Sequence, residues 1–265
     1  MNTNILKKVN KGDNMHHISL QAQRIFEGFE AFLPQIQEEE NVKQKKTSKI
    51  SKVGRKIPGI RKHECFKFNS KDDFSKQREA LTRVGASEVG SIFIGEESLN
   101  EFIITKVLKL LDREVPFKDS LSMRKGKVLE NFLFDEFIRE HGERVEVLHR
   151  NKYANGIDKY NYFKEISGAK NLVGSTIDGW FINKEGEAEL LELKSSDSYQ
   201  LKEAALEYNR TGNFIESKYF FKYYVQVQIQ LACTGLSKGN LFLTVGNEVI
   251  NCEIKRDNDF VIEVI

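Results

Sequence analysis

The sequence predicts a mixed α/β (α+β) domain with a single core, and three observations support this fold class. Apolar residues recur with helical spacing in the first half of the domain, most clearly over Lys127–Arg139. Strand-like segments joined by short turns dominate from Val145 onward, with a further helix among them. Hydrophobic residues make up 40% of the 265 residues, which is enough to bury a sizeable core.

Three helices are expected to open the domain. Ser87 and Glu88 suit the first turn of a helix over Ser87–Ile94, because serine caps free N–H groups and an acid favours the positive end of the helix dipole. A second helix is predicted over Glu101–Leu111. The third, over Lys127–Arg139, repeats apolar residues at i, i+3 and i+4.

The following segments alternate in the manner of β-strands. A short strand over Val145–Leu148 precedes two longer ones, Gly174–Asn183 and Glu187–Lys194, which a turn around residues 184–186 joins into a hairpin. A helix is predicted over Leu201–Tyr208.

The C-terminal region contains one ambiguous segment. Over Tyr219–Ala232 the apolar residues alternate like a strand, whereas the length and the glutamines suit a helix, so both structures stay open. Closing strands are predicted over Asn240–Val245, Glu248–Lys255 and Phe260–Val264.

Residues 1–65 are expected to form an extension to a domain at 66–265. The extension has 13 Lys/Arg and 7 Asp/Glu, a net +6, whereas residues 66–265 have 28 and 32, a net −4. An amphipathic helix is predicted over Ile18–Ile36, followed by a flexible basic linker with nine Lys/Arg and no acid between Lys43 and Lys62. The linker is either a DNA contact, since basic residues displace counterions from phosphates, or a solvated linker or import signal. The residues proposed for the DNA contact are Lys45, Lys46, Arg55 and Lys56.

Composition excludes several classes of protein. No segment approaches the ~18 consecutive apolar residues of a membrane span. Three widely spaced cysteines argue against a secreted disulfide framework, and neither they nor the five histidines have the spacing of a zinc site. The first 30 residues lack the apolar core of a secretory signal. We therefore expect a soluble intracellular protein.

The predicted hairpin brings two acids together. Alternate residues of a strand share a face, so Glu192 and Lys194 project together. A turn centred on Glu185 places Asp178 opposite Glu192, with Cβ atoms roughly 4.5–5.5 Å apart. Acids that close repel each other unless a cation lies between them, and hard carboxylate oxygens favour Mg²⁺, or Mn²⁺ in its place. The alternative is a surface hairpin in which Lys194 pairs with both acids.

Three further motifs accompany the hairpin. They are Arg83-Val84-Gly85-Ala86-Ser87-Glu88, Gly126-Lys127-Val128-Leu129-Glu130, and the run from Tyr223 to Gln230 followed by Thr234-Gly235. Together with Asp178-Gly179 and Glu192-Leu193-Lys194, they resemble the PD-(D/E)XK nucleases. More narrowly, they resemble the YqaJ-type viral recombinase, or lambda exonuclease-like, family over roughly Phe74 to Gly235. The resemblance implies a restriction-endonuclease-like core, with a central mixed β-sheet flanked by helices and, in this chain, the N-terminal helical and basic extension.

The resemblance also implies a catalytic site. Glu130, Asp178, Glu192 and the backbone carbonyl of Leu193 would hold one or two Mg²⁺ ions. Lys194 would be the catalytic lysine, and Gln226 would lie beside the site as a further catalytic residue.

A second set of residues would contact DNA. Ser87 matches a phosphate-binding serine, and Tyr223 and Gln228 match the motif tyrosine and second motif glutamine. Arg78, which follows Phe74 where the family usually has tryptophan, and Arg83 compete for the terminal 5′ phosphate. The family's further arginine after Glu-Leu-Lys is replaced here by Ser195-Ser196-Asp197-Ser198-Tyr199, which leaves the exonuclease polarity open.

The resemblance implies a Mg²⁺-dependent deoxyribonuclease, and the leading hypothesis is an exonuclease acting on double-stranded DNA ends in recombination or repair. An endonuclease of the restriction or nicking type and a non-cleaving DNA-binding module on the same fold stay open. The resemblance further implies a single-strand annealing protein as partner and a ring of three subunits. The expected location is cytoplasmic, or nuclear in a eukaryotic setting.

Overall fold

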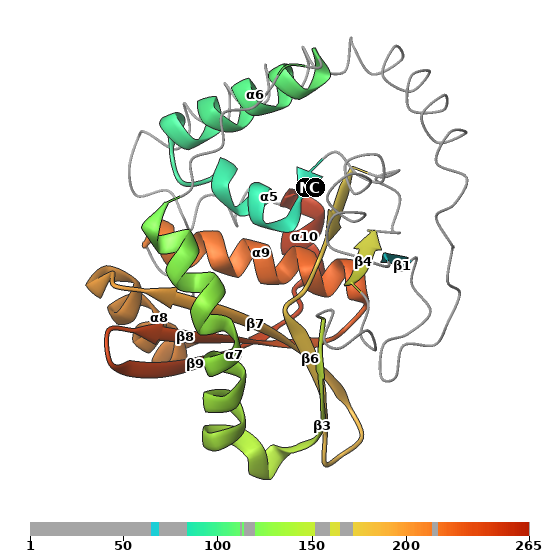
Figure 1. Ribbon diagram of the computed structural model, residues 1–265, viewed down its shortest axis with the longest axis vertical. Helices are drawn as coiled ribbons and strands as arrows, with labels where there is room; N and C mark the ends of the chain where they lie inside the picture. Colours follow the sequence, from blue (N-terminus) through green and yellow to red (C-terminus); the bar gives the residue numbers. More distant parts are fainter. Residues whose placement is uncertain are drawn as a thin grey trace.

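The computed structural model describes residues 65–68, 84–111, 113, 120–151, 160–164, 172–213 and 217–264. These residues form two β-sheets with helices packed around them (Figure 1). Within them, every helix is too short or too polar to cross a membrane. The helix predicted over Ile18–Ile36 and the predicted basic linker lie outside the described residues.

The larger sheet has five strands in the order β3-β6-β7-β8-β9. Neighbouring strands run antiparallel except β7 and β8, which are parallel. The chain must therefore cross over between these two strands, and it does so through helices α8 (Tyr199–Thr211) and α9 (Lys218–Thr234). The strands span β3 (Val145–Arg150), β6 (Gly179–Asn183), β7 (Ala188–Ser196), β8 (Lys238–Val245) and β9 (Glu248–Lys255).

A smaller sheet of four short strands has the order β1-β4-β5-β2, with β2 and β5 parallel and the other pairs antiparallel. Its strands are β1 (Cys65–Phe68), β2 (Val84–Gly85), β4 (Tyr160–Lys164) and β5 (Val173–Ser175).

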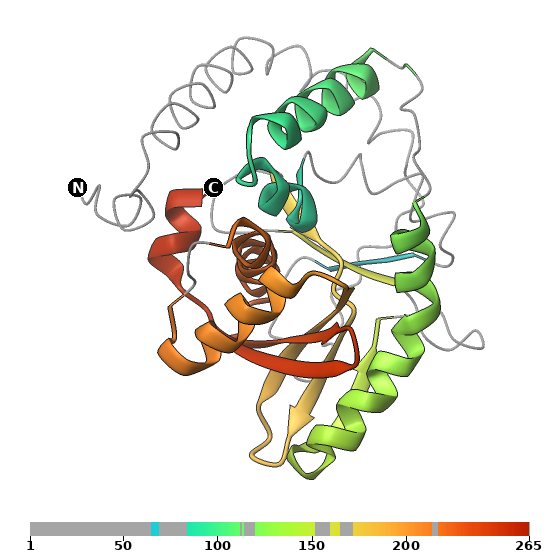
Figure 2. The same cartoon turned by 90° about the vertical axis from the view of Figure 1, so that its left-hand side faces the viewer.

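Helices cover both faces of the large sheet (Figure 2). On one face, α7 packs Leu133, Phe134 and Phe137 against Leu191 and Leu193 of β7 and against neighbouring strands. On the other face, α8 and α9 form the larger core with α5 and α10. The helices are α5 (Ala86–Ile92), α6 (Glu96–Leu110), α7 (Leu121–His141), η2 (Gly142–Arg144, a 3₁₀ turn), α8 (Tyr199–Thr211), α9 (Lys218–Thr234) and α10 (Asn258–Val264).

Most predicted elements are confirmed, with shifted ends. Helix α7 begins six residues before the predicted Lys127, because Ser120 caps it by accepting a hydrogen bond from the backbone N–H of Met123 (3.2 Å). The strand predicted over Gly174–Asn183 is in fact two strands in different sheets, β5 and β6, separated by residues 176–178.

The prediction of a closing strand over Phe260–Val264 is wrong, because these residues belong to helix α10. Asp257 accepts a hydrogen bond from the backbone N–H of Phe260 through its side chain (3.0 Å), which is the geometry of a helix N-cap. Phe260 and Val261 are buried whereas Ile262 is exposed. The apparent alternation of apolar residues was therefore part of a helical pattern.

The segment left open between strand and helix forms α9, which crosses α5 at short range. A Cβ atom added to Gly90 of α5 would lie 2.3 Å from the carbonyl oxygen of Lys222 and 3.2 Å from its Cγ. Real Cβ atoms do not come that close to backbone oxygens, so only glycine permits this crossing. The contact fixes α5 and α9 against each other at one point.

We expect Gly90→Ala to lower the free energy of unfolding by roughly 1–3 kcal/mol, because the backbone of α9 must move to admit the methyl group. Gly126→Ala is the matched control, since Gly126 also lies inside a helix but has nothing within 4 Å of its Cβ position. It should raise stability by roughly 0.5–1 kcal/mol. Urea unfolding of both variants measures the difference, and a stabilising Gly90→Ala would contradict the tight crossing.

Candidate functional site

The hairpin β6–β7 has the register expected from the sequence. Gly179 pairs with Leu191 and Trp180 with Leu190 across the two strands. Asp178 immediately precedes β6, so the same register extended by one residue brings it opposite Glu192. The expected closeness of the two acids thus follows from the observed pairing.

The glycine after Asp178 is required by close packing. A Cβ atom on Gly179 would lie 2.7 Å from the carbonyl oxygen of His149 on β3 and 2.9 Å from the ring of Phe134 on α7. The start of β6 is therefore pressed between a neighbouring strand and a helix. This packing fixes the backbone that carries Asp178.

Asp178 is tied directly to the strand opposite. Its Oδ2 accepts a hydrogen bond from the backbone N–H of Leu193 (2.9 Å). In a β-strand the N–H and C=O of one residue point to the same side. The carbonyl of Leu193 therefore faces the segment that holds Asp178, where the sequence prediction requires it.

The carboxylate of Glu192 is buried and receives three protein donors. Gln226 Nε2 donates to Oε1 (2.5 Å), and Gln230 Nε2 donates to Oε2 (2.7 Å). Lys194 Nζ forms an ion pair with Oε1. The prediction that Glu192 and Lys194 share one face of β7 is confirmed.

Gln228, predicted to contact DNA, lies away from this site. It is fully buried, its Nε2 donates to the carbonyl of Lys255 (2.8 Å), and its Oε1 accepts from the N–H of Asp257 (2.9 Å). Residues two apart on a helix point in different directions, whereas residues four apart share a face. Because the segment is a helix, Gln226 and Gln230 face Glu192 together and Gln228 anchors the chain between β9 and α10.

Two residues at the site were not assigned a role from the sequence. Gln230 and Lys222 flank Gln226 at intervals of four along α9. The helical interpretation of Tyr219–Ala232, which the sequence left open, would have placed both on the face of Gln226.

A cleft of about 760 Å³ opens above Asp178 and Lys194. Helix α7 contributes Glu130 and Gly126 to its wall, and α5 contributes Ser87 and Ser91. Helix α6 completes the wall. The structure thus gathers several predicted site residues around one cleft, namely Ser87, Glu130, Asp178, Leu193, Lys194, Tyr223 and Gln226.

The site carries negative charge that its own lysine does not balance. Burial raises the pKa of Asp178 to about 7, and the charge of Glu192 adds to the rise, against smaller opposing effects of Lys194 and of the Leu193 N–H. Burial alone would lower the pKa of Lys194, but Glu192 and Asp178 raise it overall. Lys194 is therefore protonated and pairs with Glu192, whereas Asp178 is hydrogen-bonded to a backbone N–H.

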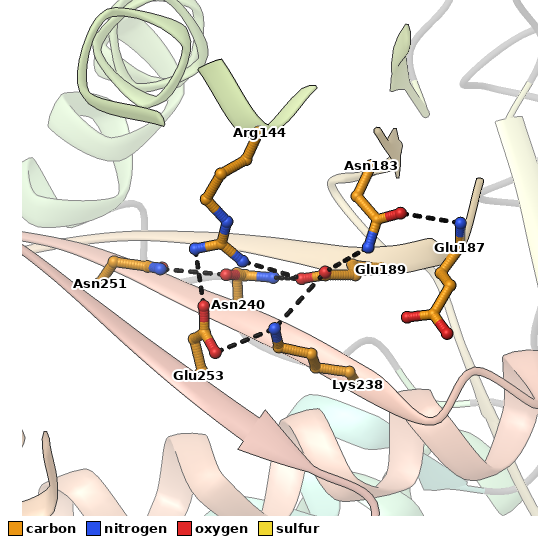
Figure 3. Close-up of polar contacts among 8 residues, drawn as sticks. All are labelled: Arg144, Asn183, Glu187, Glu189, Lys238, Asn240, Asn251 and Glu253. Atoms are coloured by element: carbon orange, nitrogen blue, oxygen red, sulfur yellow. Dashed lines mark hydrogen bonds and ion pairs between the residues drawn. The ribbon is translucent and has the colours of Figure 1, made fainter. Parts of the chain in front are cut away.

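A second buried acid, Glu189, is by contrast fully compensated (Figure 3). The amides of Asn183 and Asn240 donate to its two oxygens at 3.1 and 2.8 Å. Arg144 and Lys238 approach it at 3.5 and 3.4 Å. The same two bases pair with Glu253 at 2.6 and 2.9 Å. Two bases thus meet two acids there, so this cluster needs no further cation.

The cleft residues fit a hard divalent ion by their chemistry. Among the described residues, no three His, Cys, Asp or Glu side chains converge closely enough to hold an ion by themselves. The available donors are the carboxylates of Asp178 and Glu192, the Leu193 carbonyl and Glu130, all of them oxygen ligands of the kind that Mg²⁺ prefers. Their unbalanced charge is the observation that favours a cation.

The remaining predicted contacts fall outside the described residues. These are Arg78 and Arg83, proposed for a terminal phosphate, and the linker residues Lys45, Lys46, Arg55 and Lys56. They stay predictions.

Comparison with known protein families gives one match. The family model of the YqaJ-like viral recombinase domain matches residues 73–237. This range contains every residue of the cleft described above. A search of curated proteins gives no match.

The solved structures with a similar fold include exonucleases. An alkaline exonuclease, LHK-Exo, from Laribacter hongkongensis shares 20% identity over 74% of this chain and 87% of that chain, with a TM-score of 0.51. Its complex with dAMP gives the same values. A phage-related exonuclease from Haemophilus somnus 129PT shares 12% identity over 69% and 89% of the two chains, with a TM-score of 0.47. The match to the Laribacter enzyme confirms the predicted fold, a mixed sheet flanked by helices.

We expect Asp178→Asn to stabilise the ion-free protein at alkaline pH. The pKa of Asp178 rises from 3.8 to about 7 on folding, so ionisation of this group costs stability increasingly from pH 4 to pH 7 and fully above that. Asparagine keeps the acceptor for the Leu193 N–H but removes the charge. The gain at pH 8 should be roughly 1–3 kcal/mol and should vanish toward pH 4.

Thermal unfolding in EDTA at several pH values measures this gain. Asp135→Asn is the control, because Asp135 is an exposed acid already paired with Arg150 (2.9 Å). Equal stability of wild type and Asp178→Asn at pH 8 would contradict the described electrostatics.

Proposed function

The chain belongs to the YqaJ-like viral recombinase domain family, and from this membership and the chemistry of the cleft we propose that the protein is a divalent-ion-dependent nuclease that hydrolyses DNA from double-stranded ends. The observation that carries the proposal is the cluster of Asp178, Glu192 and Lys194 at the foot of an open cleft. The excess of carboxylate there repels a phosphodiester unless a cation is present.

The proposed metal ligands are the Asp178 and Glu192 carboxylates and the Leu193 carbonyl, with Glu130 reaching the same cleft from α7. One or two Mg²⁺ ions, or Mn²⁺ in their place, would acidify a water molecule, polarise the phosphoryl oxygens and neutralise charge on the leaving oxygen. The proposed ion is supported by the unbalanced charge around Asp178 and by the oxygen chemistry of the ligands.

The chain's own residues would act around this site. Lys194, kept protonated by the two acids, would hold the attacking water through hydrogen bonds and stabilise negative charge that develops on the phosphate. Gln226 and Gln230 would keep the Glu192 carboxylate in one orientation, since residues that hydrogen-bond a ligand fix its direction. Ser87 and Tyr223, also in the cleft wall, would contact the DNA backbone.

Action on DNA ends is proposed from the similarity to the Laribacter alkaline exonuclease. The predicted phosphate contacts of Arg78 or Arg83 and the basic residues of the extension, Lys45, Lys46, Arg55 and Lys56, belong to the same proposal. They would lengthen the DNA-binding surface beyond the cleft.

The direct test is cleavage of end-labelled linear duplex DNA beside covalently closed circles, with Mg²⁺ and with EDTA. We expect Mg²⁺-dependent loss of linear DNA while circles stay intact, and the label position gives the polarity. Nicked or linearised circles would instead indicate an endonuclease. DNA binding without cleavage of either substrate would indicate a non-catalytic binding module.

Lys194→Ala should reduce cleavage at least 100-fold without unfolding the protein, because it removes the cation beside the reacting phosphate. Lys202→Ala is a closely matched control. Lys202 also pairs with an acid, Glu248, and its Nζ lies 5.9 Å from the ring centre of Tyr199, as that of Lys194 lies 5.8 Å from Tyr223. It lies outside the cleft, so its variant should keep full activity. Full activity of Lys194→Ala would overturn the site assignment.

Gln230→Met should weaken binding of Mn²⁺ by about 10-fold or more. The substitution removes a donor that fixes the direction of one oxygen of Glu192. Gln230 Nε2 also contacts the carbonyl of Thr176 (3.1 Å), two residues before Asp178, so it ties both acid-bearing segments together. Gln228→Met, on the opposite side of the same helix and equally buried, is the control for a loss of stability alone. Calorimetric titration with Mn²⁺ decides, and equal affinities of the two variants would refute the orienting role.

A further inference from the structure

Lys222 is a second lysine of the cleft, and the proposed nuclease chemistry does not use it. It lies on α9 one turn before Gln226, on the same helical face, and it lines the cleft together with Tyr223. Its side chain is half-buried. Lysines are mostly exposed, and a partly buried one usually has a partner.

The stem of Lys222 is held in place by the crossing of α5 and α9. Its Cγ would lie 3.2 Å from a Cβ on Gly90, so the aliphatic chain packs directly over that glycine. This contact limits the directions that the ammonium group can take. Lys222 is therefore a cation whose stem is held by this packing, unlike a lysine that moves freely at the surface.

No acid of the described residues forms an ion pair with Lys222. Glu88, the acid of α5 in the cleft wall, is already engaged by Lys106 (2.9 Å) and by the backbone N–H of Gly85 (2.7 Å). The charge that acts on Lys222 is that of another lysine, Lys194. Burial lowers the pKa of Lys222, and the charge of Lys194 lowers it further.

The two lysines share one aromatic ring. Nζ of Lys194 lies 5.8 Å, and Nζ of Lys222 6.0 Å, from the ring centre of Tyr223. A ring face attracts cations only weakly, by about 0.5–1 kcal/mol at a partly exposed site. Lys194 already pairs with Glu192, so the ring compensates the charge of Lys222 only in part, and an anion can compensate it fully.

We propose that Lys222 binds a phosphate of the DNA strand that enters the cleft, on the α5–α9 side of the carboxylate cluster. This inference rests on the proposed action on DNA and adds the residue that holds the strand beside the reacting phosphate. Lys222 donates to a non-bridging phosphate oxygen, and the phosphate in turn relieves the repulsion between Lys222 and Lys194. The phosphate is either an internal phosphodiester or the terminal phosphate of the strand.

The experiment is DNA binding by Lys222→Gln, followed by fluorescence anisotropy in EDTA over a range of salt concentrations. We expect binding to weaken at least threefold at low salt, and the slope of log affinity against log salt to fall by about one, as for the loss of a single phosphate contact. Lys222→Arg should retain binding, since it keeps the charge. Lys218→Gln is the matched control, because Lys218 is an exposed lysine one turn earlier on α9.

Duplexes with a 5′ phosphate and with a 5′ hydroxyl separate the two sources of phosphate. A loss confined to the phosphorylated duplex identifies the terminal phosphate, and an equal loss on both identifies an internal one. Either outcome supports the proposal. A Lys222→Gln variant that binds both duplexes like Lys218→Gln, with an unchanged salt slope, overturns it.

This test is independent of the nuclease reaction, because binding in EDTA requires no cleavage. If wild-type protein binds DNA but never cuts it, the proposed function fails while the role of Lys222 is still measured. If it cuts DNA, Lys222→Gln should raise KM more than it lowers kcat, and its affinity for Mn²⁺ should equal that of the wild type.

Discussion

The buried carboxylate of Glu192 is the constraint on which the arrangement of the site depends. A carboxylate removed from water is costly unless donors replace its hydration. Here one donor comes from the same strand, Lys194, and two come from α9, Gln226 and Gln230. The sheet and the helix packed on it are therefore joined by hydrogen bonds as well as by apolar contact. The direction of α9 follows from this, and with it the positions of Tyr223 and Lys222 in the cleft.

The two acidic clusters of the protein differ in a way that separates structure from function. Around Glu189, bases and amides satisfy both oxygens, and Arg144 and Lys238 bridge onward to Glu253. That cluster fixes strands β7, β8 and β9 relative to one another and needs nothing more. Around Asp178 the pKa is raised mainly by burial, and the charge of Glu192 adds to the rise. Ionising this acid beside an open cleft is therefore costly, and binding of a cation would offset the cost.

The hairpin could be predicted from sequence because its information is local. A period of two, a short turn and the spacing of Asp178 from Glu192 are enough to fix the register, and the observed pairing of Gly179 with Leu191 agrees. The face of α9 could not be fixed in the same way. Its apolar residues alternate over Val225 to Leu231 because the helix is buried nearly all round, so the pattern loses the helical period. The resemblance placed Gln228 with Gln226 as the second motif glutamine, and Gln230 was given no role.

The cationic side of the cleft depends on contacts between segments distant in sequence, and for this reason it is the part that the sequence alone does not reveal. Lys222 is one lysine among many until α5 crosses α9 at Gly90 and confines its stem. The acids, in contrast, come from adjacent strands and from a motif in the middle of α7. The cleft thus joins a carboxylate side specified by local pairing to a cationic side specified by helix packing. A phosphodiester with bound cations needs the carboxylate side and the cationic side at once. The carboxylates act on the phosphate only through the cations, whereas a lysine can hold the strand directly. With the proposed role of Lys222, the close approach of two helices at a single glycine would serve substrate recognition as well as stability.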